Sequence, residues 1–188
     1  MGAGGVIVAV IFVLILVGLG LGVWWLLFHT PGLDAKKCEG SPFYKNQTNI
    51  VKKELALKTC SVFQPPNTEK HQDSNIDKPT GFSHDWEMTA VPEEFPVWDK
   101  EMYYAAHFVN MNNGHYGKMS DWSSVPSSKD HTLPSVAWDA GKFSDASMWG
   151  LNVYRASKSD GSDKKLVGKG RYNPANNKFG YIDFFPPS

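Results

Sequence analysis

Apolar residues are unevenly distributed along this chain, and the longest unbroken apolar run, "VIVAVIFVLILVGLGLGVWWLLF", extends from Val6 to Phe28. As a helix this run would be about 34 Å long, enough to cross a hydrocarbon core of roughly 30 Å. A secretory signal has a shorter apolar region, a basic start and a small-residue cleavage site. Trp24 and Trp25 fall at the end of the run, where indole rings favour the membrane interface. We therefore predict a retained transmembrane anchor over residues 1–31.

Two glycines inside the predicted anchor, Gly18 and Gly22, have the G-x-x-x-G spacing that lets two membrane helices approach closely. Glycine is also common in membrane helices that have no such partner. The spacing therefore identifies a candidate helix-packing face without showing what packs there.

Two sequence features predict on which side of the membrane the rest of the chain lies, and they disagree. No lysine or arginine precedes the apolar run, whereas Lys36, Lys37 and Lys45 follow it closely, which places the C-terminal part on the cytoplasmic side. The sequon "NQT" at Asn46 would be glycosylated only on the lumenal side. We give the lysines more weight and expect the cytoplasmic side, with Asn46 free of glycan.

Residues 32–80 are predicted to form a membrane-proximal segment and a polar linker. The stretch "NIVKKELALK" fits a short helix, with Val51 and Leu55 four residues apart, but its alternation from Leu55 onward also fits a strand. Residues 64–80, "QPPNTEKHQDSNIDKPT", are polar and contain three prolines, which is typical of a linker or an extended arm.

Residues 81–188 have the pattern of a β-rich domain. The stretches 149–157, 165–172 and 178–185 alternate apolar and polar residues and are separated by the turn sequences "SKSDGSDK" and "NPANN", which predicts a three-stranded antiparallel meander. The stretch 101–114 fits either a helix or a strand, and its aromatic content favours the strand. The stretch 135–143 is a second short candidate strand. The predicted fold class is mainly β: one N-terminal transmembrane helix followed by a small antiparallel sandwich or barrel.

Three glycines in the predicted meander, Gly168, Gly170 and Gly180, have no side chain to pack against a neighbouring strand. Glycine inside a strand indicates a bulge or a close approach of another backbone. We expect one or the other at each position.

Composition narrows the possible partners. Acidic and basic residues are balanced at 19 each, and Arg155 and Arg171 are the only arginines in the sequence. Because arginine is the residue that reads phosphate and guanine, this argues against a nucleic-acid partner. Cys38 and Cys60 could close a disulfide worth about 3 kcal/mol, or they could remain free thiols in a reducing cytoplasm.

No catalytic motif was found: there is no G-x-S-x-G, no P-loop and no H-E-x-x-H. The histidines His84, His107 and His115, with Asp121, match no known spacing of metal ligands, and "SDGSDKK" lacks the spacing of a calcium loop. We predict a protein that is not an enzyme and has no metal or cofactor.

Tryptophans are the remaining candidates for function, because Trp and Tyr carry much of the binding energy at protein interfaces. Trp122 lies in the polar stretch "KMSDWSSVPSS" and has few apolar neighbours in sequence. It is the best single candidate for an exposed interface anchor.

The overall plan of anchor, arm and small β-rich, lysine-dominated domain resembles that of the membrane-linked minor capsid proteins of large icosahedral DNA viruses. The resemblance covers the layout and includes no motif. It implies a structural protein that ties an internal virion membrane to its shell, with a lipid bilayer and neighbouring structural proteins as partners. The alternatives are an accessory subunit of a membrane protein complex and a membrane-tethered carbohydrate-binding module.

Overall fold

The computed structural model describes most of the chain after the predicted anchor, namely residues 35–45, 49–88, 98–128, 132–143 and 145–185. Within these ranges, no helix has the length and apolar character needed to cross a bilayer. The predicted anchor lies outside them, together with Gly18, Gly22, Trp24 and Trp25, and so does the sequon residue Asn46.

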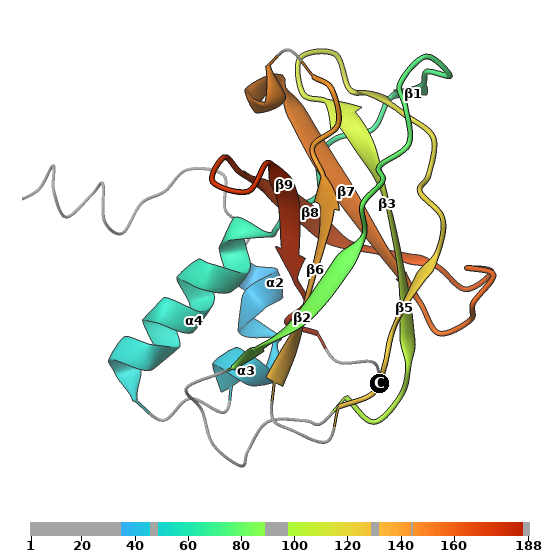
Figure 1. Ribbon diagram of the computed structural model, residues 1–188. Helices are drawn as coiled ribbons and strands as arrows, with labels where there is room; N and C mark the ends of the chain where they lie inside the picture. Colours follow the sequence, from blue (N-terminus) through green and yellow to red (C-terminus); the bar gives the residue numbers. More distant parts are fainter. Residues whose placement is uncertain (1–34, 46–48, 89–97, 129–131, 144, 186–188) are drawn as a thin grey trace, which may run out of the picture. The chain divides into compact units, whose positions relative to one another are not determined.

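A small helical layer precedes the sheet (Figure 1) and consists of α2 (Ala35–Glu39), α3 (Pro42–Lys45) and α4 (Ile50–Val62). The stretch that fitted either a helix or a strand is therefore helical. Asn49 caps α4, because its side-chain oxygen accepts a hydrogen bond of 3.0 Å from the backbone N–H of Val51. Lysine, glutamate, leucine and alanine follow the cap, and all of them favour a helix.

The rest of the described chain is mainly β, which confirms the coarse fold class. Its strands are β1 (His71–Gln72), β2 (Ser83–Met88), β3 (Met102–Asn110), β4 (His115–Tyr116), β5 (Ser123–Val125), β6 (Thr132–Asp139), β7 (Trp149–Ala156), β8 (Lys165–Asn173) and β9 (Lys178–Ile182). They form one nine-stranded sheet in the order β1-β4-β3-β7-β8-β9-β6-β2, with β5 also paired to β3. All pairs are antiparallel except β1 with β4.

The sheet curls so that strands distant in its order face each other across the core (Figure 1). The ring of Phe108 on β3 lies 5.8 Å from that of Phe179 on β9, although β7 and β8 separate these strands. The hydroxyl of Tyr104 on β3 donates a 3.0 Å hydrogen bond to Asp183, just after β9. Large aromatic side chains, including Trp98 and Trp138, fill the enclosed space.

The predicted meander is confirmed, because β7, β8 and β9 pair in sequence order. A register shift between Val153 and Tyr154 marks a bulge in the β7–β8 pair. Gly168 shows the expected close approach of a backbone, because a Cβ there would lie 2.6 Å from the carbonyl oxygen of Phe63. At Gly170 the close neighbour is a side chain instead, since a Cβ would lie 2.8 Å from a methyl carbon of Leu151. The expectation was wrong for Gly180, where a Cβ would meet nothing within 4 Å.

The expected linker over residues 64–80 is instead part of the folded unit, which extends over Asp34–Ser188. Gln64 is buried and donates a 2.7 Å hydrogen bond to the carbonyl of Val167, and Asn67 bonds to Asn152 on β7. Ile76 is buried as well. The prediction failed because three polar side chains, Gln64, Asn67 and Glu69, find partners on the sheet, although most of the others stay exposed.

Candidate functional site

An open hollow with an aromatic wall is a candidate binding site in the described part of the chain. Its volume is about 510 Å³. Phe108 comes from β3, Trp149 begins β7, and Phe143 lies in the connection between β6 and β7. The rings of Phe143 and Trp149 stack with centroids 4.1 Å apart, and Phe108 meets Phe143 edge-on at 4.7 Å.

Polar side chains surround this aromatic wall, from the segment before β2 and from the turn after β6: Asn75, Asp77, Lys78, Thr80 and Lys142. Gly141 lines the hollow beside Phe143 and has a φ of +73°, a conformation that L side chains rarely adopt. The site therefore combines a partly exposed apolar face with hydrogen-bonding groups of both charges, as ligand sites commonly do.

Trp149 also borders a second, smaller hollow of about 280 Å³. Asn67, Lys169, Arg171 and Tyr172 contribute to its lining. Trp149 thus lines both hollows, and it is only half-buried. A partner that covers its indole would bury it further, and buried aromatic anchors contribute much of the binding energy at interfaces.

A cluster of titratable side chains surrounds Glu69 in the segment that was expected to be a linker. One carboxylate oxygen of Glu69 lies 2.8 Å from Nε2 of His107, and accepts hydrogen bonds from Asn152 at 2.6 Å and from the Tyr154 hydroxyl at 2.9 Å. The His107 ring stacks on Tyr116 with centroids 4.9 Å apart. These contacts fasten the segment onto β3 and β7.

Burial governs the chemistry of this cluster. Desolvation lowers the pKa of His107, against the opposing effect of Glu69, and favours the neutral imidazole. Desolvation and the hydrogen bond to Glu69 raise the pKa of Tyr154, so the phenol stays protonated. Since His107 is 3% exposed, its ring has little access to a substrate in solvent. The arrangement accounts for a structural role of these side chains in holding the segment.

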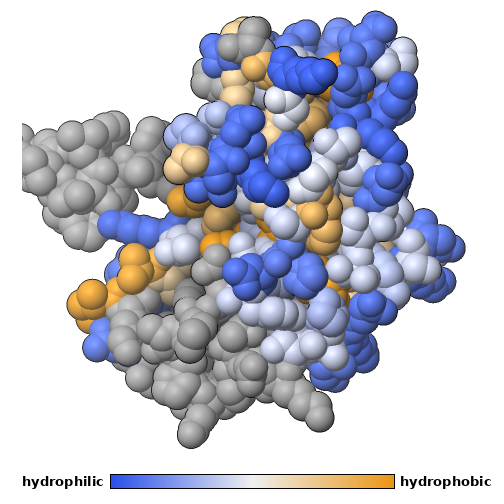
Figure 2. All heavy atoms as spheres, viewed as in Figure 1, coloured by the Kyte–Doolittle hydropathy of each residue, from blue (hydrophilic) through white to orange (hydrophobic). Residues whose placement is uncertain are grey.

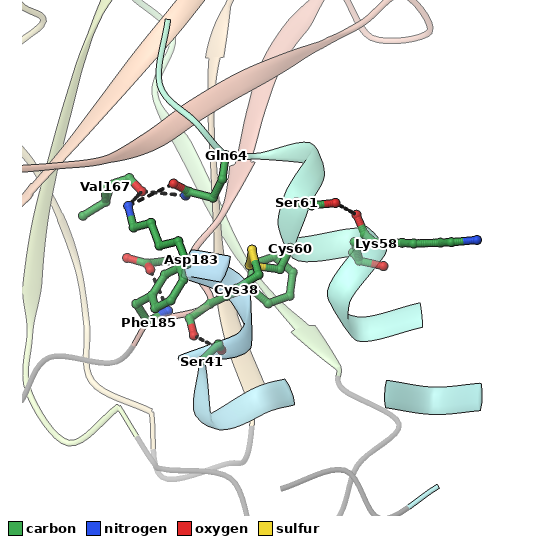
Figure 3. The surroundings of a disulfide bond; sticks show 12 residues. Cys38, Ser41, Lys58, Cys60, Ser61, Gln64, Val167, Asp183 and Phe185 are labelled. Atoms are coloured by element: carbon green, nitrogen blue, oxygen red, sulfur yellow. Dashed lines mark hydrogen bonds between the residues drawn. A yellow bond between two sulfur atoms is a disulfide. The ribbon is translucent and has the colours of Figure 1, made fainter. Parts of the chain in front are cut away.

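A disulfide joins two helices of the helical layer to each other, and hydrogen bonds tie the layer to neighbouring segments (Figure 3). Cys38 on α2 and Cys60 on α4 are joined across a sequence separation of 22, and both are buried. Ser41 donates a 2.7 Å hydrogen bond to the carbonyl of Phe184 in the C-terminal segment. Lys37 donates one of 2.9 Å to Gln64. The sequence did not decide between a disulfide and two free thiols, and in this structure Cys38 and Cys60 form the disulfide.

A buried ion pair also holds the C-terminal segment, in this case against β7. Arg155 on β7 donates a 2.7 Å hydrogen bond to the fully buried carboxylate of Asp183 and another to the carbonyl of Phe185. Desolvation is the largest single effect and lowers the pKa of Arg155, but Asp183, Tyr104 and Tyr181 together outweigh it, so the net shift is upward. The guanidinium therefore stays charged beside its partner.

The remaining candidates from the sequence lie in different parts of the sheet. Trp122 is half-buried, and its ring lies over Gly161, where a Cβ would come within 2.1 Å of it. His84 is on β2, His115 is on β4, and Asp121 pairs with Lys78 at 2.8 Å. Among the residues that the structure describes, no three His, Cys, Asp or Glu side chains are grouped to hold a metal ion.

Sequence reasoning did not find the hollow beside Trp149. Phe108 is far from Phe143 and Trp149 in sequence, and the three residues share no motif. Comparison with known protein families, with curated proteins and with solved structures finds no match to this chain.

Proposed function

We propose that this chain is a non-enzymatic structural protein that links a membrane to a neighbouring protein layer or large assembly. The observation that carries the proposal is the order of its parts. The apolar run ending at Phe28 is followed, after a few residues, by a folded unit that begins at Asp34. A domain attached so directly to an anchor is held near the bilayer surface.

The start of the folded unit, where the chain arrives from the proposed anchor, is held by a covalent bond and by hydrogen bonds. Such an arrangement suits a protein that transmits force. The chain enters the folded unit through α2, and α2 is joined to α4 by the disulfide between Cys38 and Cys60. Lys37 and Ser41 add hydrogen bonds to Gln64 and to the C-terminal segment. A pull on the N-terminal end would therefore be shared by α4 and the C-terminal segment rather than act on α2 alone.

The aromatic hollow is the docking site that the geometry supports best. It offers the half-buried Trp149 beside polar groups of both charges, and interface hot spots are rich in such aromatic residues. The layout resembles that of viral minor capsid proteins, so a neighbouring shell protein on an internal virion membrane is the proposed partner. An accessory subunit in a membrane complex would use the same site.

The test is incorporation of Trp149→Ala into the native assembly, with folding checked by thermal melting. Truncating a hot-spot residue costs about 2 kcal/mol, a factor of roughly thirty in affinity. Trp122→Ala should be measured in parallel as the candidate taken from sequence. Leu166→Ala is the control, since Leu166 is exposed on β8 and lines neither described hollow. Normal incorporation of both tryptophan variants would contradict docking by these residues.

A carbohydrate-binding module is the second candidate, favoured by one observation. The Phe143–Trp149 stack stands beside Asn75, Asp77 and Lys142, and sugars bind proteins through aromatic faces combined with polar side chains. Titration of the full chain in detergent with a panel of glycans, followed by NMR, tests it. A saturable glycan shift that disappears in Trp149→Ala would favour this candidate over protein docking.

The disulfide bears on where the mature domain resides. Structural disulfides persist in oxidising surroundings, which include virion surfaces and the lumen of the secretory pathway. We propose that the domain is inserted on the cytoplasmic side, as Lys36 and Lys37 predict, and is oxidised in the mature particle. Protease protection in sealed vesicles distinguishes this arrangement from a lumenal domain.

A further inference from the structure

The first two turns of α4 expose apolar side chains to solvent. Ile50, Val51 and Leu55 are 75%, 74% and 64% exposed, and they are half of the six large exposed apolar residues in the described chain. Figure 2 shows them as an orange projection at the lower left, at the start of α4. We refer to these three residues as the α4 stripe.

The stripe lies on the outer face of α4, and the opposite face is already occupied. Ala56 and Cys60, four residues apart, are buried against the domain. Glu54 and Lys58 share the outer side with the stripe. No neighbouring element of the described structure covers this face, so three large apolar side chains stay in water unless a further surface covers them.

The short connection between the apolar run and α2 limits which surface can cover the α4 stripe. If residues 6–28 cross a bilayer, residues 29–34 separate the bilayer from α2 by at most about 20 Å. The disulfide then couples α2 to α4. The helical layer is therefore confined to the neighbourhood of the membrane surface by its covalent connections.

The charges of the helical layer match an anionic membrane surface. Between residues 35 and 62 the chain has six lysines (36, 37, 45, 52, 53 and 58) and two acidic residues (39 and 54), a net charge of 6 − 2 = +4. The whole chain, by contrast, has a net charge of zero. Lysines beside an apolar helix face attract anionic lipid headgroups while the apolar side chains enter the interface.

We propose that the α4 stripe inserts into the headgroup region of the bilayer that the N-terminal anchor crosses. The inference rests on the proposed anchoring function. The stripe forms a second, reversible contact with lipid beside the permanent anchor. This contact fixes the orientation of the β-rich domain and turns a fixed part of its surface towards the neighbouring protein layer.

The test uses the full chain in vesicles of phosphatidylcholine and phosphatidylserine. A nitroxide label is attached through Leu55→Cys, with the native disulfide intact, and Met111→Cys provides a matched control. Met111 is also apolar and is 57% exposed, but it lies in the turn after β3. Collisions with oxygen, which concentrates in lipid, are compared with collisions with a water-soluble nickel complex.

We expect the label at position 55 to collide several-fold more often with oxygen than with nickel, and the label at 111 to show the reverse. Adding Ile50→Ser and Val51→Ser should return position 55 to the behaviour of position 111. Pure phosphatidylcholine vesicles should weaken the effect.

Three outcomes overturn the inference. A chain that floats with the vesicles but has a nickel-accessible label at position 55 retains its anchor and lacks the second contact. A label shielded from both reagents, with spin–spin broadening between copies, shows that a second copy or another protein covers the stripe. A chain that does not float with the vesicles overturns the anchoring proposal and this inference together.

Discussion

At the scale of single residues, Gly168 is the position where β8 and the end of the helical layer come closest. Any Cβ there would lie 2.6 Å from the Phe63 carbonyl oxygen, the Gln64 amide and the Tyr181 ring. We predict that Gly168→Ala lowers the free energy of unfolding by about 1–3 kcal/mol, the usual cost of overpacking. Urea denaturation followed by circular dichroism measures it.

The matched control is Gly180→Ala in β9, where a Cβ would meet nothing within 4 Å. Alanine has less freedom than glycine in the unfolded chain, so this variant should be neutral or more stable by about 0.5–1 kcal/mol. Equal destabilisation of the two variants would show that loss of strand flexibility, and not contact with Phe63, explains the effect.

The shifted pKa of His107 leads to a prediction about how the free energy of unfolding depends on pH. This pKa is lowered in the folded state, chiefly by desolvation, so below a pH of about 6.5 the unfolded chain takes up the proton more readily than the folded one. The neutral His107 side chain therefore contributes its full share of the stability above that pH. This share is lost as the pH falls from there through the pKa that His107 has in the folded state. We expect His107→Gln to flatten the decline of unfolding free energy between about pH 7 and pH 5.

Denaturant titrations at a series of pH values would measure this slope. The control is His84→Gln, because His84 is exposed on β2 and lies outside the Glu69 cluster. An unchanged slope in His107→Gln would mean that other groups cause the acid sensitivity of the domain.

At the scale of elements, the helical layer depends on its cross-link. The exposed stripe of α4 contributes nothing to packing in the described structure, and α2 is only five residues long. A helix that short is unstable without tertiary contacts. We predict that Cys38→Ala with Cys60→Ala lowers the free energy of unfolding by about 3 kcal/mol, as expected for a loop of this size.

Reduction of the unmodified protein should produce a similar loss, measured by denaturant unfolding with and without a thiol reductant. The double variant is the control, because the reductant should leave its stability unchanged. If reduction has no effect on the unmodified chain, the non-covalent contacts of the layer, including the hydrogen bonds of Lys37 and Ser41, suffice to hold it.

At the scale of the whole molecule, the proposed linking function depends on the N-terminal apolar run. We predict that residues 6–28 are retained and span a bilayer, so intact mass spectrometry should find a mature chain that still contains Val6 to Phe28. Leu14→Asp with Val17→Asp should block insertion, at roughly 2.5–3.5 kcal/mol for each central aspartate. Alkaline extraction of membranes then releases the variant and not the original chain.

A mature N-terminus beyond Phe28 would contradict the anchor and leave a released domain. Leu14→Ile with Val17→Ile is the control, because these changes keep the run apolar. A mass shift of the mature protein on glycosidase treatment would place Asn46 in the lumen and reverse the expected orientation.

The sequence by itself determined the elements whose signals are local. The alternation in residues 149–185 was enough to place β7, β8 and β9, because a meander pairs neighbouring strands through short turns. The same holds for β3 and for most of β6, which the aromatic content of their segments indicated. The mainly β class follows from these strands without any long-range information.

Tertiary structure decided everything that depends on distant partners. Residues 64–80 look like a linker because their polar groups could be satisfied by water, and only the fold brings Asn152, His107 and Tyr154 to them. The helix over residues 50–62 and the Cys38–Cys60 bond were likewise undetermined until α2 and α4 were placed together. The hollow beside Trp149 exists because the curled sheet brings Phe108 to Phe143, and no local pattern encodes that contact.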